Sequence, residues 1–206
     1  CAIGVNVPTG KDSLSLSQQY PNGEKIISPG TVIVSSGGEV SDVRKVVSPV
    51  LVNDAATRLL HIDFSFDNLK LGGSALEQSI GRLGSEVPTV RNPQYFCECF
   101  EAVQEMIRRG WILAGHDISA GGLITTLLEM TFANVDGGLR INLYDMAGDN
   151  LVKKLFAENP GVVIQISNDN ADAVKAFLEE NNIGFARIGT PTPDKRTLSI
   201  ADRDKN

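Results

Sequence analysis

The stretch Ala114-Gly115-His116-Asp117-Ile118-Ser119-Ala120-Gly121-Gly122-Leu123 decides the fold, because it places an acid after an apolar run and two glycines before a helical pattern. Upstream, residues 111–114 are apolar and predict a short buried strand. Downstream, apolar residues recur at helical spacing and predict a helix to about Asn134. Strand, tight turn and helix therefore follow one another, which indicates an α/β fold.

Asp117 and Ser119 stand where such folds bind ligands. The carboxyl ends of strands face helix N-termini, whose backbone N–H groups and dipole favour phosphate. Asp117 would hold a cation and Ser119 a phosphate oxygen, and the pair favours magnesium because hard cations take few carboxylates and let phosphate oxygens complete the shell. The alternative is equally open: Gly121 and Gly122 only shape the turn, and Asp117 only caps the helix.

Other catalytic motifs fail on spacing or composition. The segment from Gly4 to Ser13 does not have the spacing of a phosphate-binding loop, and Asp12 follows the lysine where Ser or Thr is needed. His61 and His116 are the two histidines, too few for a metal-dependent phosphohydrolase, and no Cys or His group has zinc-ligand spacing. Ser119 lies outside any Gly-x-Ser-x-Gly pattern, which argues against a serine hydrolase.

Composition limits location and partners. The 206 residues are 42% hydrophobic, enough to bury a core, and carry a formal charge of −6 with a pI near 5.0. An acidic chain is unsuited to nonspecific nucleic-acid binding. No apolar run reaches the roughly 20 residues that span a bilayer, no signal peptide is evident, and three cysteines suggest free thiols. We expect a cytoplasmic protein without membrane or nucleic-acid partners.

The first 50 residues resemble a piece of a sheet. Apolar alternation predicts strands at Ala2–Val7, Leu14–Ser17 and Thr31–Ser35, with a hairpin turn at Asn22-Gly23. The chain starts at Cys1 directly before the first strand, so we expect a segment cut from a longer protein. Strands without their neighbours leave unpaired edges, and we expect this segment to be mobile or to self-associate.

From Arg58 onward, strands and helices alternate. Ser74 is a predicted helix cap with Glu77 at the capping-box position, and Pro93 opens the clearest amphipathic helix. We expect the tail Asp202–Asn206 to be frayed. The predicted strands are 59–64, 111–114, 138–143, 161–166, 186–190 and 197–201, and the predicted helices are 74–83, 93–110, 122–134, 151–158 and 171–181.

Five motifs resemble the phosphoribosylformylglycinamidine synthase family and occur in that family's order: Pro8–Ser15, Asp42–Arg44, Leu71–Leu76, Gly115–Leu123 and Pro160–Gln165. The resemblance spans almost the whole chain and is to the second half of the synthetase region of the long, single-chain form. This half is similar to aminoimidazole ribonucleotide synthetase. One position departs from the family pattern: Ala120 stands where a second aspartate usually precedes the glycine pair.

The resemblance implies a fold and a domain division. Residues 1–50 would be the C-terminal strands of a preceding synthetase-like α/β domain. Residues 51–206 would form a three-layer α/β/α domain of the aminoimidazole ribonucleotide synthetase C-terminal type. The alternation of strands and helices after Arg58 agrees with this division.

The resemblance also implies an ATP-dependent ligase of purine biosynthesis. The parent enzyme would use ATP and ammonia from glutamine to convert formylglycinamide ribonucleotide to formylglycinamidine ribonucleotide. Asp117 would bind Mg²⁺ on ATP or ADP and Ser119 would touch the phosphates, while Lys11, Asp12 and Ser13 would line the facing loop of the preceding domain. The nucleotide site of this half is either catalytic or structural.

Partners and alternatives follow from the same comparison. The partner would be the rest of the parent chain, including a glutaminase domain, and the isolated chain would be inactive. Two other functions stay open: a noncatalytic structural or interaction domain in which the glycine turn is architecture alone, and another member of the same ATP-dependent synthetase superfamily.

Overall fold

The structure, a computed structural model, describes residues 2–10, 17–27 and 33–202. The chain divides into two compact units, Cys1–Val43 and Arg44–Asn206. The second unit begins before the predicted boundary at residue 51, because the N–H of Gly115 donates to the carbonyl of Ser48 and Val47 packs on the core. The assignment of residues 1–50 to a preceding domain stays a prediction.

The described part of the first unit contains one hairpin. β1 (Ser17–Gln19) pairs antiparallel with β2 (Lys25–Ile27). The N–H of Gly23 donates to Tyr20 across the turn, and Gly23 has φ 85°, a conformation that glycine adopts without a steric penalty. The predicted hairpin at Asn22-Gly23 is confirmed.

Two other strand predictions in this unit are wrong where the structure describes them. Residues 2–7 and 33–35 form no strand, and their side chains are exposed. Residues 14–16 and 31–32 lie outside the described residues. Alternating apolar residues favour an extended chain, but a strand also needs a neighbour for its backbone N–H and C=O groups. No such neighbour pairs with 2–7 or 33–35 in the described part of the unit.

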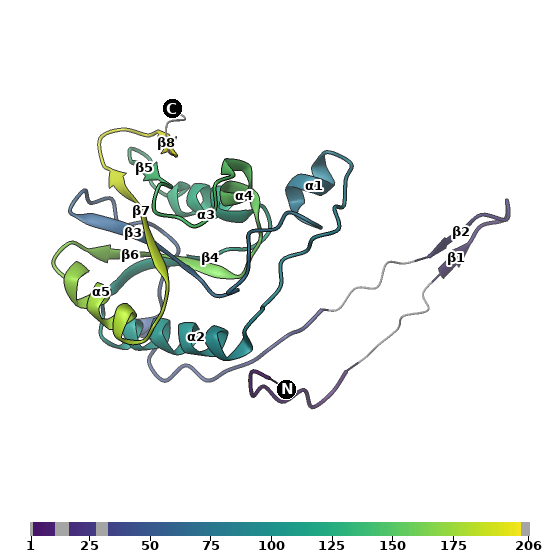
Figure 1. Cartoon of the computed structure of the whole chain (residues 1–206), viewed down its shortest axis with the longest axis horizontal. Coiled ribbons are helices and arrows are strands. Elements are labelled where there is room, and N and C mark those ends of the chain that lie inside the picture. Colours follow the sequence, from purple (N-terminus) through teal and green to yellow (C-terminus); the bar gives the residue numbers. More distant parts are fainter. Residues whose placement is uncertain (1, 11–16, 28–32, 203–206) are drawn as a thin grey trace. The chain divides into compact units, whose positions relative to one another are not determined.

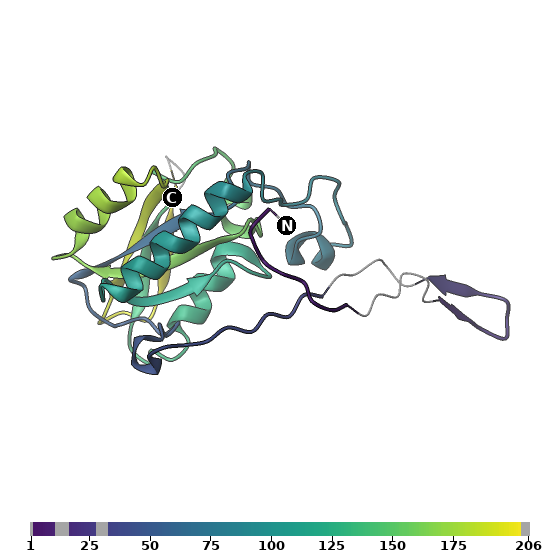
Figure 2. The same ribbon diagram turned by 90° about the horizontal axis from the view of Figure 1, so that it is seen from below.

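The second unit is built on a six-stranded mixed sheet with the order β4-β6-β3-β7-β5-β8. Its strands are β3 (Thr57–Asp63), β4 (Ile112–Asp117), β5 (Gly138–Asn142), β6 (Gly161–Ser167), β7 (Phe185–Thr192) and β8 (Leu198–Ala201). Helices cover both faces, with α2 (Pro93–Arg108) and α5 (Ala171–Glu180) on one side and α3 (Gly122–Thr131) and α4 (Leu151–Phe156) on the other (Figures 1 and 2). The predicted three-layer α/β/α architecture is confirmed.

Local capping explains where the helices begin. The Asn92 side chain accepts hydrogen bonds from the N–H groups of Gln94 and Tyr95, and Pro93 occupies the first helical position of α2. The Ser74 hydroxyl caps α1 (Ala75–Ser79), as predicted. This helix ends before the predicted Leu83, because Gly81 takes φ 72° and turns the chain away. A 3₁₀ turn, η1, spans Val43–Lys45.

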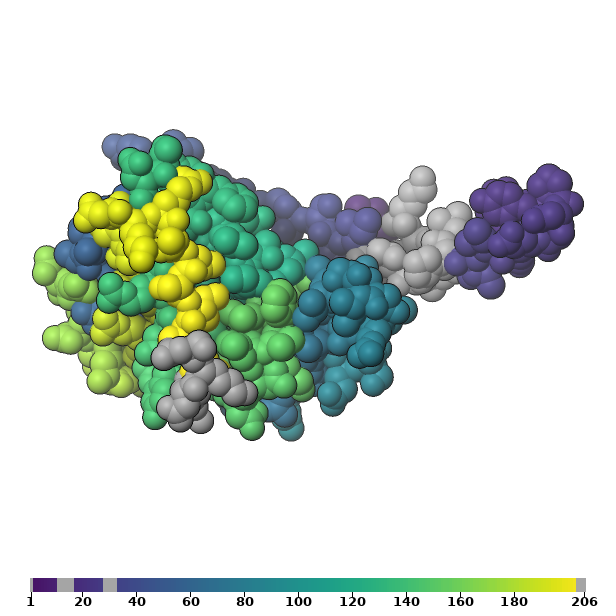
Figure 3. Space-filling model, turned by 90° about the horizontal axis from the view of Figure 1, so that it is seen from above, coloured from purple at the N-terminus to yellow at the C-terminus, as the bar shows by residue number. Residues whose placement is uncertain are grey.

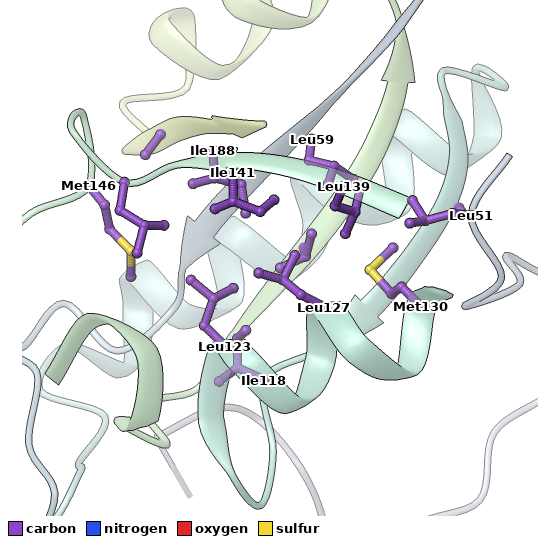
Figure 4. Close-up of a cluster of buried hydrophobic side chains, with 14 residues drawn as sticks. Leu51, Leu59, Ile118, Leu123, Leu127, Met130, Leu139, Ile141, Met146 and Ile188 are labelled. Carbon is purple, nitrogen blue, oxygen red and sulfur yellow. The ribbon is translucent and has the colours of Figure 1, made fainter. Parts of the chain in front are cut away.

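Each face of the sheet has its own apolar core. On one face, Leu123, Leu127 and Met130 of α3 pack against the side chains of β5 (Figure 4). Their spacing of three or four residues puts them on one stripe of the helix. The opposite core joins α2 and α5 to β3, β4 and β6 through Leu60, Ile62, Cys99, Met106, Ile164, Val174 and Leu178.

A buried ion pair joins α4 to Asp202, the residue that follows β8. The Lys154 ammonium is fully buried and donates to Asp202 Oδ1 at 2.8 Å and to the Leu143 carbonyl at 2.8 Å. In Figure 3 the yellow surface of the C-terminal strands lies beside the green surface of α4. The prediction that Asp202 belongs to a frayed tail is wrong, because its carboxylate neutralises a charge that has no access to water. Residues 203–206 lie outside the described residues.

The strand directions place the carboxyl ends of β3 and β4, and the loops that follow them, at the same end of the sheet. β3, β4, β5 and β8 run in one direction, and β6 and β7 run against them. Asp117 and Asp63 therefore end their strands at the same edge, opposite Val162 and Gly161 of β6. Across the described residues, none of the helices is both long and apolar enough to cross a membrane.

Candidate functional site

Asp117 is the last residue of β4, and its side chain is 71% exposed. Its backbone carbonyl accepts a hydrogen bond from the hydroxyl of Thr126, one turn into α3, at 2.9 Å. This bond fixes the end of the strand to the helix that follows. The backbone is held while the carboxylate stays in solvent, which is the arrangement that a ligand-binding acid requires.

His116 lies between two carboxylates. Its Nδ1 is 3.2 Å from Asp117 Oδ1, and its Nε2 is 3.1 Å from Glu129 Oε2 on α3. The imidazole thereby restricts the direction of the Asp117 side chain. Sequence reasoning missed Glu129, because its contact with His116 depends on how α3 packs beside β4.

The glycine pair is required by geometry. Gly121 and Gly122 have φ 91° and 71°, and a Cβ on Gly122 would lie 2.7 Å from the carbonyl carbon of Phe156. The N–H of Gly122 donates to the Ser119 carbonyl at 3.0 Å. The chain therefore turns sharply after Ser119 and lets α3 approach the end of α4, which only glycine permits at position 122.

Glu158 joins two of the motifs. Its Oε1 accepts the N–H of Gly121 at 2.7 Å and the N–H of Ala75 at 2.8 Å. The Leu71–Leu76 and Gly115–Leu123 motifs are thus held together at the beginnings of α1 and α3. Sequence reasoning missed this residue, whose only signal is its position just before the Pro160–Gln165 motif. The Glu158 carboxylate thus accepts the N–H of Gly121, one of the backbone groups at the start of α3 that we expected to bind phosphate.

The structure brings Asp117 and Ser119 together on one exposed turn, and the Ser119 side chain has no hydrogen bond to any described residue. A hollow of about 320 Å³ borders Asp117 and His116, with apolar walls from α2, β6 and Val47. Lys11, Asp12 and Ser13 lie outside the described residues. Within those residues, no three His, Cys, Asp or Glu side chains are placed to hold a metal ion, so Asp117 could supply a single ligand.

Comparisons with known proteins bear on this geometry. The family described as AIR synthase related protein, C-terminal domain, matches residues 64–201, which include the Asp117 turn and Glu158. The chain belongs to this family. The predicted similarity to the aminoimidazole ribonucleotide synthetase C-terminal domain is confirmed.

A curated relative from Arabidopsis thaliana supports the closer resemblance. It is described as a probable phosphoribosylformylglycinamidine synthase, chloroplastic/mitochondrial, and is 38% identical over 193 residues. The match covers 92% of this chain but 13% of the relative. The chain therefore spans a small part of that protein.

Solved structures share the fold. T. maritima PurL complexed with ATP has a TM-score of 0.58 at 14% identity, covering 79% of this chain and 26% of that one. PurL complexed with FGAR gives 0.60 at 14% identity, covering 79% and 28%. E. coli HypE, a hydrogenase maturation protein, gives 0.51 at 17% identity, covering 75% and 48%. At these identities the likeness establishes the architecture of the family.

Proposed function

We propose that this chain is a segment of a phosphoribosylformylglycinamidine synthase. The parent enzyme converts formylglycinamide ribonucleotide, glutamine and ATP to formylglycinamidine ribonucleotide, glutamate, ADP and phosphate. The observation that carries the proposal is the 38% identity to a protein of that description over 92% of this chain. The exposed Asp117 carboxylate at a strand end adds the chemistry that a nucleotide site needs.

The proposed roles follow from the turn. Asp117 would provide one oxygen ligand to Mg²⁺, and Ser119 would donate its hydroxyl to a nucleotide phosphate. The donor set suits this ion, since Mg²⁺ commonly takes one or two carboxylates and completes its shell with phosphate oxygens and water. When bound, the ion would neutralise charge on the transferring phosphoryl group. On the resemblance alone, we also propose that Lys11, Asp12 and Ser13 contact the nucleotide.

The surrounding residues would keep the turn in position. Thr126 holds the backbone of Asp117, His116 restricts its carboxylate, and Glu158 secures the glycines. A preorganised acid loses little conformational freedom when it binds a ligand. These residues are therefore positioning residues for the proposed site.

The remaining machinery would come from the rest of the parent chain, including a glutaminase domain that supplies ammonia. We expect the parent to be cytoplasmic and the 206-residue chain alone to have no synthetase activity, because one acid and one serine cannot organise phosphoryl transfer. Turnover of formylglycinamide ribonucleotide by the isolated chain with ATP and ammonia would contradict this expectation.

The test is Asp117→Asn in the parent enzyme. We expect magnesium–nucleotide binding at this site to weaken at least about tenfold, by calorimetry, with the fold preserved by circular dichroism. Asp172→Asn, an exposed acid on α5, is the matched control and should bind as the wild type does. Unchanged nucleotide occupancy in Asp117→Asn would favour the noncatalytic interaction domain.

A further inference from the structure

A second cavity in the second unit lies at the same end of the sheet strands but shares no lining residue with the hollow beside Asp117. It has a volume of about 610 Å³. Its walls come from the end of β3 and the loop after it, from residues 145–150, and from the start of β7. This volume falls in the range of small-molecule sites.

His61 lines this cavity. Its side chain belongs to a residue only 8% exposed, and it makes no hydrogen bond or ion pair with any described residue. Burial lowers the pKa of His61 to about 4, against a smaller opposing effect of Asp63, so the ring is neutral at pH 7. A neutral imidazole offers one donor and one acceptor nitrogen, and buried groups of this kind are usually satisfied by a partner.

The cavity wall is acidic. Its carboxylates are those of Asp63, Asp67, Glu86, Asp145 and Asp149, against the ammonium groups of Lys70 and Lys153. Asp67 is neutralised by Lys70 at 2.5 Å, and Asp63 is occupied by Ser65 and Phe66. Glu86, Asp145 and Asp149 are exposed and form no ion pair within the described residues, and neither does Lys153. Three free carboxylates against one free ammonium leave the net charge at the cavity negative.

The charge and the aromatic content together select a ligand class. A negative wall repels phosphate esters and attracts cations. The described residues contain no group of three ligating side chains for a metal ion. Phe66 and Tyr95, whose ring centroids are 4.9 Å apart, add an aromatic surface of the kind that attracts ammonium groups.

We propose that this cavity binds a small organic polyamine, with an N–H of the amine donating to His61 and its outer ammonium groups lying against Asp145 and Asp149. The site is independent of the proposed synthetase activity. His61 lines the cavity and bonds to no described residue, so its imidazole is available to hydrogen-bond a ligand there.

Spermidine is the probe for the test, with the full 206-residue chain at low ionic strength. Calorimetry should give a dissociation constant for spermidine below about 1 mM. The chain has two histidines, so the Hε1 signals of His61 and His116 can be followed by NMR and assigned with His61→Gln. We expect spermidine to shift the His61 signal and to leave that of His116 in place.

Paired charge variants separate the site from general attraction. Asp145→Asn with Asp149→Asn, both exposed and safe for folding, should weaken spermidine binding about tenfold. Glu101→Gln with Glu180→Gln removes the same charge elsewhere and should change binding less than about twofold. Equal losses in the two pairs, an unmoved His61 signal, or the absence of binding would overturn the proposal. An equal His61 shift with Mg²⁺ alone would also overturn it, in favour of a divalent-cation site.

Discussion

β3 and β4 run parallel on either side of β6, and each carries a histidine close to a terminal aspartate, yet the two pairs behave differently. The Asp63 carboxylate accepts the Ser65 hydroxyl at 2.6 Å and the N–H groups of Ser65 and Phe66, so it builds the loop after β3. The Asp117 carboxylate is largely in solvent and receives no backbone N–H from the described residues. Asp63 therefore stabilises the turn that follows it. The turn after Asp117 depends on glycines instead, so the Asp117 carboxylate is accessible to a ligand.

The histidines differ in the same way. His61 is buried and forms no hydrogen bond or ion pair with any described residue, whereas His116 lies between Asp117 and Glu129. Residue type and strand position are therefore insufficient to assign a role. The number of backbone groups that depend on a polar side chain distinguishes a structural acid from one available to a ligand.

The largest expected effect concerns the glycine turn after Asp117. Gly122→Ala should lower the free energy of unfolding by at least about 3 kcal/mol, because the new Cβ would meet the backbone of Leu155 and Phe156 at a positive φ. Urea denaturation measures the loss. Gly148→Ala is the control: its φ is 92°, but the nearest contact is Leu69 at 3.7 Å, so we expect about 1 kcal/mol. Equal losses would show that the clash is relieved by movement of α4.

The second effect is a pH dependence caused by His61. Its pKa is about 4 in the folded protein and 6.5 in the unfolded chain, so the unfolded chain binds more protons between these values. Stability should therefore fall as the pH is lowered, by about 2 kcal/mol from pH 7 to pH 5. The pKa of Asp67 is lowered to about 2, chiefly by its bonds to Lys70 and Thr89. The stability that Asp67 contributes is therefore lost only below about pH 4, outside the range from pH 7 to pH 5. His61→Gln should flatten the profile, and an unchanged slope would assign it to other groups.

The smallest effects compare the two aspartates directly. Asp63→Asn should reduce stability by about 1–2 kcal/mol, because it removes the charge that strengthens the bonds to Ser65 and Phe66. Asp117→Asn should change stability by less than about 0.5 kcal/mol. Thermal and urea unfolding of both variants measure these losses. A larger loss of stability for Asp117→Asn than for Asp63→Asn would show that Asp117, and not Asp63, is the structural acid.

Local patterns predicted much of the second unit. The cap at Ser74, the position of Pro93, the amphipathic spacing in α2, and the strand, turn and helix around Asp117 all depend on neighbouring residues. The contacts of Glu158 with Ala75 and Gly121 could not be predicted, since they join segments 83 and 37 residues apart. The His61 cavity was missed for the same reason: its walls come from separate loops that meet only in the folded sheet.

In the first unit, the sequence predicted the local hairpin but not the absence of the other strands from the described residues. Its hairpin was predictable because the Asn22-Gly23 turn and its pairing lie within a few residues. The strands expected at residues 2–7 and 33–35 required distant partners, which alternation of apolar residues does not supply. The roles of Lys11, Asp12 and Ser13 stay predictions.

The pairing of Lys154 with Asp202 has a consequence for synthesis on the ribosome. The lysine is translated 48 residues before its counter-ion, so α4 cannot bury its ammonium as an ion pair until the end of β8 has emerged. The second unit must therefore complete its fold late, with the parallel strand β8 added beside β5 as the closing event. A nascent chain arrested before residue 202 has emerged would expose this face of α4 to proteases and chaperones, and emergence of residue 202 would protect it.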